Sequence, residues 1–284
     1  IGAIVERQGE VAQRVSATGR EAERGPLLAL GFVKLMNDGV LSAHTAVLLE
    51  DYADRPGWRG EYIVEPDVLA SRVRRLAAAG LPVAIHSIGD AAVRASLDAF
   101  EGAQTLPVPQ PHRIEHIELL HPDDLPRFAE LGVVASMQPN HATNAIGYVP
   151  ERVGEARAAN AYVWRALLDD GATLVFSADY GTSPLSPLTQ IADAVFRTSP
   201  FGFNDGKPWH PEQSVTFEQA LHAYTQASAD ITAWGDALGS VTVGKWADFV
   251  VLDGRVPEPM DESFRELSVA HTFLAGREVY AAEE

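Results

Sequence analysis

The sequence predicts an α/β fold with a parallel sheet, followed by a small β appendage. Five short apolar runs rich in β-branched residues recur at residues 31–36, 82–86, 112–117, 133–138 and 172–179. Helix-like segments separate these runs, and strands that alternate with helices of this length are typical of parallel βα units. The last forty residues instead hold short strand-like runs with turn residues between them.

The connecting segments carry helix start and stop signals. The segment 65–80 has Pro66 early, arginines late and glycine at its end, which is the order expected of a helix. The segments 121–132 and 159–171 also finish in glycine. Residues 1–25 are polar and helix-prone and suggest no site.

The alternation of apolar strands and helices ends after residue 179. A loop rich in Pro and Gly leads to a helix, a long polar stretch at 199–213 and a further helix at 217–230. Short strands follow at 247–253 and 269–282. We expect two domains, one over residues 1–235 and a small β domain over 236–284.

The composition of the chain excludes several classes of protein and partner. Of the 284 residues, 46% are hydrophobic and 21% charged, as in ordinary globular chains. The net charge of −17 and the lack of a Lys/Arg run argue against nucleic acid or an anionic membrane as partner, and no apolar run approaches the ~18 residues of a membrane span. The absence of cysteine excludes disulfides and thiolate ligands, which fits the cytoplasmic location that we expect.

Polar side chains stand at the ends of the predicted strands, where parallel sheets and barrels gather functional groups. The series is Lys34 with Asp38 beyond it, His86, Glu115 with His116, Gln138, and Asp179. Each has a structural alternative when taken alone. A single strand-end histidine is more often a hydrogen-bonded structural residue, and Asp179 could cap the following turn.

Lys34 is the least ordinary member of the series, because it lies within an apolar strand. Burial of an unpaired ammonium is costly and lowers its pKa, unless the side chain reaches the rim. Two imidazoles, a carboxylate and such a lysine suit a divalent metal, with Zn²⁺ the preferred ion. A neutral lysine can take up CO₂ to form a carbamate, which could bridge two ions.

These residues stand in motifs that resemble the amidohydrolase superfamily, and within it the N-substituted formamide deformylase-like group. The motifs are "VKLMNDGVLSAHTA" (33–46), "HSIGDAAV" (86–93), "HRIEH" (112–116), "RFAELGVVASMQPNHA" (127–142), "SADYGTSPLSPL" (177–188) and "GSVTVGKWADFVVLD" (239–253). The resemblance implies a (β/α)₈ TIM-type barrel with a small β-sandwich built from both chain ends. Residues 31–179 then correspond to barrel strands 4 to 8.

The resemblance also implies roles for individual residues. Lys34, carboxylated or not, His86, His116 and Asp179 would bind one or two metal ions, and Asp179 would take the proton of the attacking water. In the matching segments we expect Asp38, Gln138 and His141 to contact a small-molecule substrate. The activity implied is hydrolysis of an amide-type C–N bond other than a peptide bond, for example in an N-substituted formamide.

The sequence departs from the family pattern in several places. The family's first barrel strand carries His-x-His, and this sequence contains none. His44 stands where relatives commonly have Arg, and Tyr180 with Gly181 replaces an aromatic-Pro pair. Because five strands cannot close a barrel, we expect open sheet edges, an incomplete metal site and a possible homo-oligomer.

Two other functions remain open at this stage. Lys34 could be the Schiff-base nucleophile of a metal-free lyase or aldolase-like barrel. Alternatively, the chain could be an inactive, degenerate relative that binds a partner through its sheet edge. We expect substrate specificity to lie in loops over residues 139–160 and 199–215.

Overall fold

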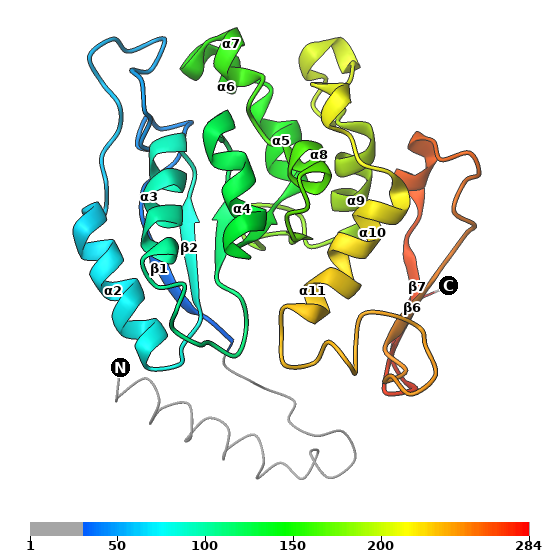
Figure 1. Ribbon diagram of the computed structural model, residues 1–284. Coiled ribbons are helices and arrows are strands. Elements are labelled where there is room, and N and C mark those ends of the chain that lie inside the picture. The colour runs from blue at the N-terminus through cyan, green and yellow to red at the C-terminus, as the bar shows by residue number, and fades with distance from the viewer. Residues whose placement is uncertain (1–30, 284) are drawn as a thin grey trace.

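The protein, described over residues 31–283 in a computed structural model, is built around a parallel five-stranded sheet (Figure 1). The strands are β1 (Val33–Met36), β2 (Val83–Ser87), β3 (Arg113–His116), β4 (Val134–Met137) and β5 (Leu174–Phe176). They lie side by side in chain order, each parallel to the next, so the predicted α/β class and parallel sheet are confirmed. The helix-prone segment 1–25 lies outside the described residues.

The sheet is open within the described part of the chain, with β1 and β5 as its edges. The central strands β2 and β4 are buried along their whole length, as expected of apolar strands covered on both faces. The edge strand β1 differs, because its residues alternate between half-buried and exposed. Lys34 is therefore exposed, and the expectation of a buried lysine was wrong, since no described strand lies beyond β1 to cover it.

Helices cover the sheet between successive strands (Figure 1). They are α2 (Pro66–Ala78) and α3 (Asp90–Glu101), then η1 (Pro122–Asp124) with α4 (Leu125–Leu131), and α8 (Trp164–Asp169). Helix α2 begins at its proline and buries Leu69, Val73 and Leu76, a spacing that places them on one face. The helix predicted over 159–171 begins only at Trp164.

Two segments expected to be loops contain helical turns. Residues 139–160 form α5 (Pro139–Ala145), α6 (Val149–Val153) and α7 (Glu155–Ala158), and residues 199–215 contain η2 (Phe203–Gly206) and η3 (Pro211–Gln213). After α9 (Pro187–Phe196), the single helix expected over 217–230 is divided into α10 (Phe217–Tyr224) and α11 (Gln226–Asp230). The break occurs at Thr225, whose ψ of −85° departs from helical geometry.

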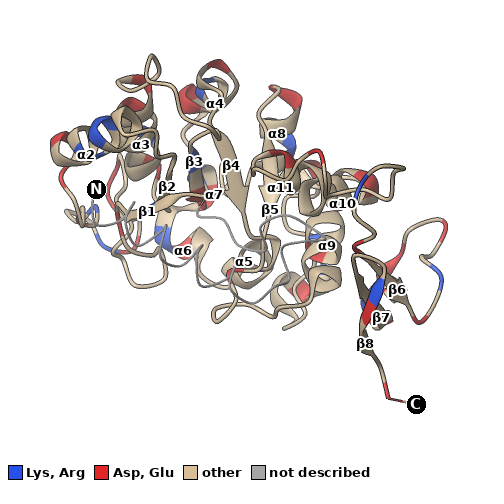
Figure 2. Ribbon diagram, turned by 90° about the horizontal axis from the view of Figure 1, so that it is seen from below, with Lys and Arg blue, Asp and Glu red and all other residues tan. Residues whose placement is uncertain are grey.

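A small antiparallel sheet follows, with β6 (Phe249–Leu252), β7 (Val269–Leu274) and β8 (Arg277–Ala281) in that order. Figure 2 shows it to one side of the larger sheet, beyond α9 and α10. The turn η4 (Glu262–Glu266) joins the two parts, because Phe264 is buried against Phe217 and Arg265 Nη1 donates to Asp193 Oδ1 over 2.6 Å. The domain boundary at residue 236 stays a prediction.

Within residues 31–283, none of the helices combines the length and the apolar character needed to cross a lipid bilayer.

His112, at the opposite end of β3 from the strand-end histidine, makes stability depend on pH. Its ring stacks on Phe100 at 4.7 Å, its Nδ1 accepts from Val83 N, and burial lowers its pKa to about 4. The unfolded chain has a histidine pKa of about 6.5, so between these two pKa values it binds more protons than the folded protein. The free energy of unfolding should therefore fall as pH drops from about 6.5 to about 4, by up to about 3 kcal/mol.

The variant His112→Asn keeps an acceptor for Val83 N but cannot take up this proton. We expect the loss of stability between pH 7 and pH 4.5, measured by urea unfolding, to be smaller in the variant than in the wild type. Equal losses in the two proteins would show that His112 does not control this dependence.

Candidate active site

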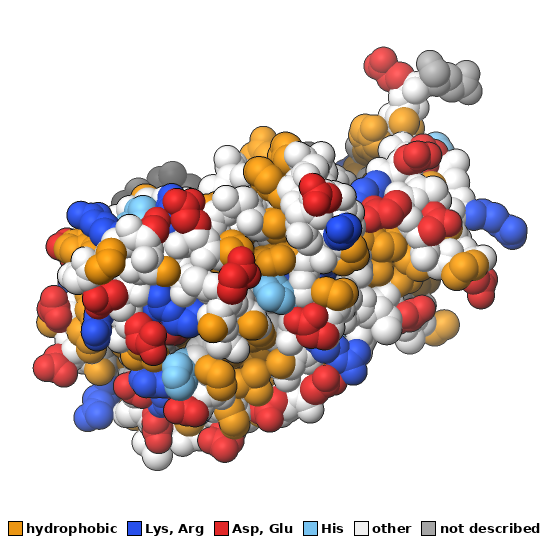
Figure 3. Space-filling view, turned by 90° about the horizontal axis from the view of Figure 1, so that it is seen from above, with side chains coloured by type: hydrophobic (Ala, Val, Ile, Leu, Met, Phe, Trp, Pro, Cys, Tyr) orange, Lys and Arg blue, Asp and Glu red, His pale blue; other side chains and the backbone are white. Residues whose placement is uncertain are grey.

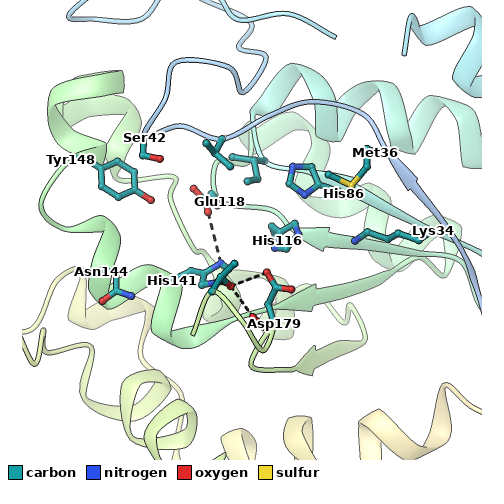
Figure 4. A pocket seen from close by; sticks show the side chains of 13 residues that line it. Lys34, Met36, Ser42, His86, His116, Glu118, His141, Asn144, Tyr148 and Asp179 are labelled. Carbon is teal, nitrogen blue, oxygen red and sulfur yellow. Dashed lines mark hydrogen bonds and ion pairs between the residues drawn. The ribbon is translucent and has the colours of Figure 1, made fainter. Parts of the chain in front are cut away.

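A cavity of about 540 Å³ opens at the carboxyl ends of the five strands (Figure 4). Figure 3 views this side of the molecule and shows histidine and hydrophobic side chains reaching its surface. Lys34, His86, His116, His141 and Asp179 all line the cavity, together with Met36, Val40, Ser42, Ile88, Glu118, Asn144, Tyr148 and Thr182. The structure thus brings most of the predicted site residues to one place, and leaves Asp38 and Gln138 outside the lining.

His86 is held by the loop that follows β1. Its Nε2 lies 2.9 Å from the Gly39 carbonyl oxygen and 3.6 Å from Asp38 Oδ1. Since a carbonyl only accepts, Nε2 carries the proton and Nδ1 keeps the free lone pair. Burial lowers the pKa of His86, and the nearby Lys34 lowers it further, so the ring is neutral at physiological pH.

His116 is oriented through its Nδ1, whereas His86 is oriented through its Nε2. Its Nδ1 lies 2.8 Å from Gln138 Oε1, while Gln138 Nε2 donates to Ser177 Oγ over 2.9 Å. With the Gln138 amide oriented in this way, His116 donates through Nδ1 and keeps its lone pair on Nε2. Burial holds the pKa of His116 well below its usual value, and its ring centroid lies 4.5 Å from that of His86.

Lys34 and Asp179 contribute the charged groups of this end of the cavity. Figure 4 shows Lys34 extended toward His116, with Asp179 below the two histidines. Partial loss of hydration lowers the pKa of Lys34, and Arg113 lowers it further. Asp179 has a left-handed backbone (φ 51°), and the Thr182 hydroxyl lies 3.0 Å from its Oδ2. Such conformations cost energy and often mark functional sites.

Asp38 is fully buried beside the site rather than in it. Its carboxylate accepts hydrogen bonds from the backbone N–H groups of Val47, Ile88 and Gly89 at 2.9–3.0 Å. Burial raises the pKa of Asp38 to about 7 despite these donors. Asp38 was predicted to contact substrate, and its carboxylate instead joins two loops of the cavity wall.

Glu115 also lies away from the cavity lining. Its Oε1 accepts a hydrogen bond from Arg113 Nε over 2.6 Å, so the carboxylate is paired with a neighbour on its own strand.

His141 links the strand-end residues to the far end of the cavity. Its Nε2 lies 3.3 Å from Thr182 Oγ1, its Nδ1 lies 3.9 Å from Glu118 Oε1, and its ring is stacked 5.8 Å from that of His116. Burial lowers the pKa of His141. It is therefore a neutral imidazole with Glu118 on one side and Asp179, through Thr182, on the other.

Glu118 and Asn144 line the far end of the cavity and were not predicted from the sequence. Glu118 carried a usable signal, since a carboxylate inside the apolar run "HIELL" has to be paired or functional. Asn144 and Tyr148 lie on and beside the short helices that were expected to be loop.

The donor types at the strand ends fit a divalent metal ion. Two neutral imidazoles offer free lone pairs on Nδ1 of His86 and Nε2 of His116, and Asp179 adds a carboxylate. Among residues 31–283, however, no three His, Asp or Glu side chains lie close enough together to hold an ion by themselves. The described residues thus supply suitable ligands but not a complete site.

Sequence comparison identifies relatives that match most of the chain. The chain is 33% identical over 258 residues to the protein LONG AFTER FAR-RED 3 of Arabidopsis thaliana, 30% over 258 residues to the putative amidohydrolase YtcJ of Bacillus subtilis, and 29% over 210 residues to the N-substituted formamide deformylase of Arthrobacter pascens. These matches cover 89%, 90% and 73% of this chain but only 43%, 48% and 38% of the relatives. The chain therefore spans less than half the length of these curated relatives.

Solved structures agree with the sequence matches. An uncharacterized metal-dependent hydrolase from Pyrococcus furiosus superposes with a TM-score of 0.66 at 35% identity, over 83% of this chain and 47% of the other. The corresponding hydrolase from Pyrococcus horikoshii gives 0.67 at 33% identity, over 82% and 46%. The sequence model of the amidohydrolase family matches residues 3–280. The chain belongs to the amidohydrolase family.

Proposed function

We propose that this chain forms part of a metal-dependent hydrolase that cleaves an amide-type C–N bond other than a peptide bond. The observation that carries the proposal is the gathering of Lys34, His86, His116 and Asp179 along one cavity at the carboxyl ends of parallel strands. The two histidines are neutral, and each leaves one ring nitrogen free. The names of the formamide deformylase and of the metal-dependent hydrolases support this reaction class.

In this proposal His86, His116 and Asp179 would each supply a ligand to a divalent metal site, with zinc the preferred metal, and Lys34 would contribute its carbamate. Because the described residues alone do not complete the site, further ligands have to come from outside them. A bound divalent ion polarises a carbonyl and lowers the pKa of water toward neutrality. The proton transfers would be carried out by side chains of this chain.

Asp179 is the group suited to move the proton. It is exposed to the cavity, and the Thr182 hydroxyl beside Oδ2 fixes its orientation. The oxygen of water forms a bond to the amide carbonyl carbon, and Asp179 accepts one proton from that water. The C–N bond then breaks, and Asp179 returns the proton to the leaving nitrogen, so the products are a carboxylic acid and an amine.

Chelation tests the proposal. The whole protein that contains this chain should hydrolyse N-butylformamide, lose that activity on dialysis against a chelator, and regain it with zinc. Turnover that persists after the metal has been removed, with metal content measured by mass spectrometry, would rule the proposal out.

A second reaction is favoured by the position of Lys34 in the cavity lining, where partial loss of hydration lowers its pKa, since the neutral form of a lysine can attack a carbonyl. In that case Lys34 would form a Schiff base with a carbonyl substrate. Borohydride reduction would then attach the substrate to Lys34 irreversibly, which mass spectrometry of the digested protein would detect. A carbamate on Lys34 would exclude this alternative.

A further inference from the structure

The Thr182 hydroxyl joins the candidate proton-transfer residue to a histidine on another element. Thr182 Oγ1 lies 2.8 Å from the main-chain oxygen of Asp179, 3.0 Å from its Oδ2 and 3.3 Å from His141 Nε2. Asp179 and Thr182 belong to the turn after β5, whereas His141 lies on α5, directly after β4. Both the histidine and the aspartate line the cavity (Figure 4). Contacts from two neighbouring strand ends therefore converge on one oxygen atom.

The single proton of this hydroxyl decides which group donates to which. A hydroxyl gives one proton and offers two lone pairs, while a main-chain oxygen and a carboxylate only accept. The proton of Thr182 is thus directed to the nearer oxygens of Asp179, so His141 approaches the hydroxyl as a donor, through Nε2–H. Its Nδ1 keeps the lone pair and lies 3.9 Å from Glu118 Oε1, beyond hydrogen-bond distance.

The Asp179 side chain has little other support. Its left-handed backbone (φ 51°) is a conformation that persists in a non-glycine residue only where the surroundings hold it. Thr182 N donates to the main-chain oxygen of Asp179 over 3.1 Å and closes the turn. Within residues 31–283, the hydrogen bond to the carboxylate itself comes from the Thr182 hydroxyl alone. The direction of the carboxylate therefore depends on how that hydroxyl is held.

His141 is held more firmly than the exposed turn that it contacts. Its N–H donates to the main-chain oxygen of Gln138 over 3.0 Å, and its ring is stacked 5.8 Å from that of His116. The preceding residue, Asn140, is buried and bonded to two fully buried side chains of α9, Gln190 through its N–H and Asp193 through Nδ2, each over 2.9 Å. The imidazole is therefore a fixed donor to which the Thr182 hydroxyl can be tied.

We propose that His141 is a positioning residue, which acts through the Thr182 hydroxyl to hold the Asp179 carboxylate in its place at the cavity. The assignment rests on the proposed function, in which Asp179 accepts a proton from water and returns it to the leaving nitrogen. A carboxylate that is free to rotate spends less time in the geometry needed for these transfers. His141 would then control turnover without touching the substrate, in place of the substrate contact that the sequence suggested.

Kinetics of the whole protein with N-butylformamide separate positioning from substrate binding. His141→Leu removes the N–H donor, and Thr182→Val removes the hydroxyl while keeping the shape of the side chain. Each should lower kcat by about 30-fold or more with little change in KM, because misplacing a reacting group costs up to about 100-fold in rate. His222→Leu, on the exposed face of α10, should behave as the wild type does. A raised KM with unchanged kcat in His141→Leu would make this histidine a substrate contact and overturn the proposal.

The double variant tests whether His141 acts through Thr182. If it does, His141→Leu/Thr182→Val should lose no more kcat than the worse of the two single variants, whereas independent roles would give additive losses and refute the link. Thr182→Ser keeps the hydroxyl, and His141→Gln keeps an N–H donor on a side chain of similar reach. Both should recover most of the lost kcat, and failure of both to do so would mean that packing rather than hydrogen bonding is responsible.

Crystal structures of the metal-free whole protein test the positioning without turnover. The Asp179 carboxylate should keep its place in the wild type, in Thr182→Ser and in His222→Leu, and should lose it in His141→Leu and in Thr182→Val. An unmoved Asp179 carboxylate in His141→Leu would contradict the proposal. If the carboxylate moves as expected while the wild-type protein hydrolyses no amide, the proposed reaction is wrong and the positioning of Asp179 by His141 stands.

Discussion

Replacing His116 with asparagine in the whole protein is expected to reduce kcat/KM for amide hydrolysis by about 1,000-fold or more. The imidazole presents Nε2 with a free lone pair because Nδ1 donates to Gln138. Asparagine is shorter and offers no ring nitrogen at that place, so the site would lose a ligand. Loss of several kcal/mol of transition-state stabilisation corresponds to about this factor. Steady-state kinetics and metal analysis of the same samples would measure both effects.

A matched control separates this effect from general damage. His222 is an exposed histidine on α10, and His222→Asn should leave kcat/KM and metal content unchanged. Retention of full activity in His116→Asn would remove His116 from the proposed site. Loss of activity with full metal content would instead assign His116 to substrate rather than to the metal.

The sequence was sufficient to predict the strands and the residues at their ends. Strands such as β2 and β4 are continuous apolar runs bounded by turn residues, which is a local signal. Because the strands are parallel, His86, His116 and Asp179 reach the same edge of the sheet, and the alternating pattern already implied this. The metal and substrate roles of these residues stay predictions.

The errors concern what only the folded chain brings together. The exposure of Lys34 depends on whether a neighbouring strand covers β1, and nothing within the strand sequence reports that. Asn144 enters the cavity on the short helix α5, whose few residues give too little periodicity to predict. Glu118 was readable as a carboxylate in apolar surroundings, but its burial beside Tyr162 becomes visible only in three dimensions.

Asp38 is another residue whose contacts are formed only in the folded chain. Its replacement should have the largest effect on stability. Asp38 was expected to contact substrate, and it instead accepts from Val47 N, Ile88 N and Gly89 N, which are 9, 50 and 51 residues away along the chain. In Asp38→Ala these three donors would lose their acceptor. At about 1–3 kcal/mol for each unsatisfied donor, the free energy of unfolding should fall by at least about 3 kcal/mol.

Urea unfolding of wild type and Asp38→Ala measures this loss directly, and Asp51→Ala provides the comparison. Asp51 lies in the same loop and also accepts from a backbone N–H, that of Gly57, but it does so at the surface where water replaces it. Its removal should therefore change stability far less. Similar losses in the two variants would mean that the buried carboxylate does not hold the cavity wall together. Because Ile88 and Gly89 directly follow the strand that carries His86, a large loss confined to Asp38→Ala would make Asp38 the group that positions this histidine.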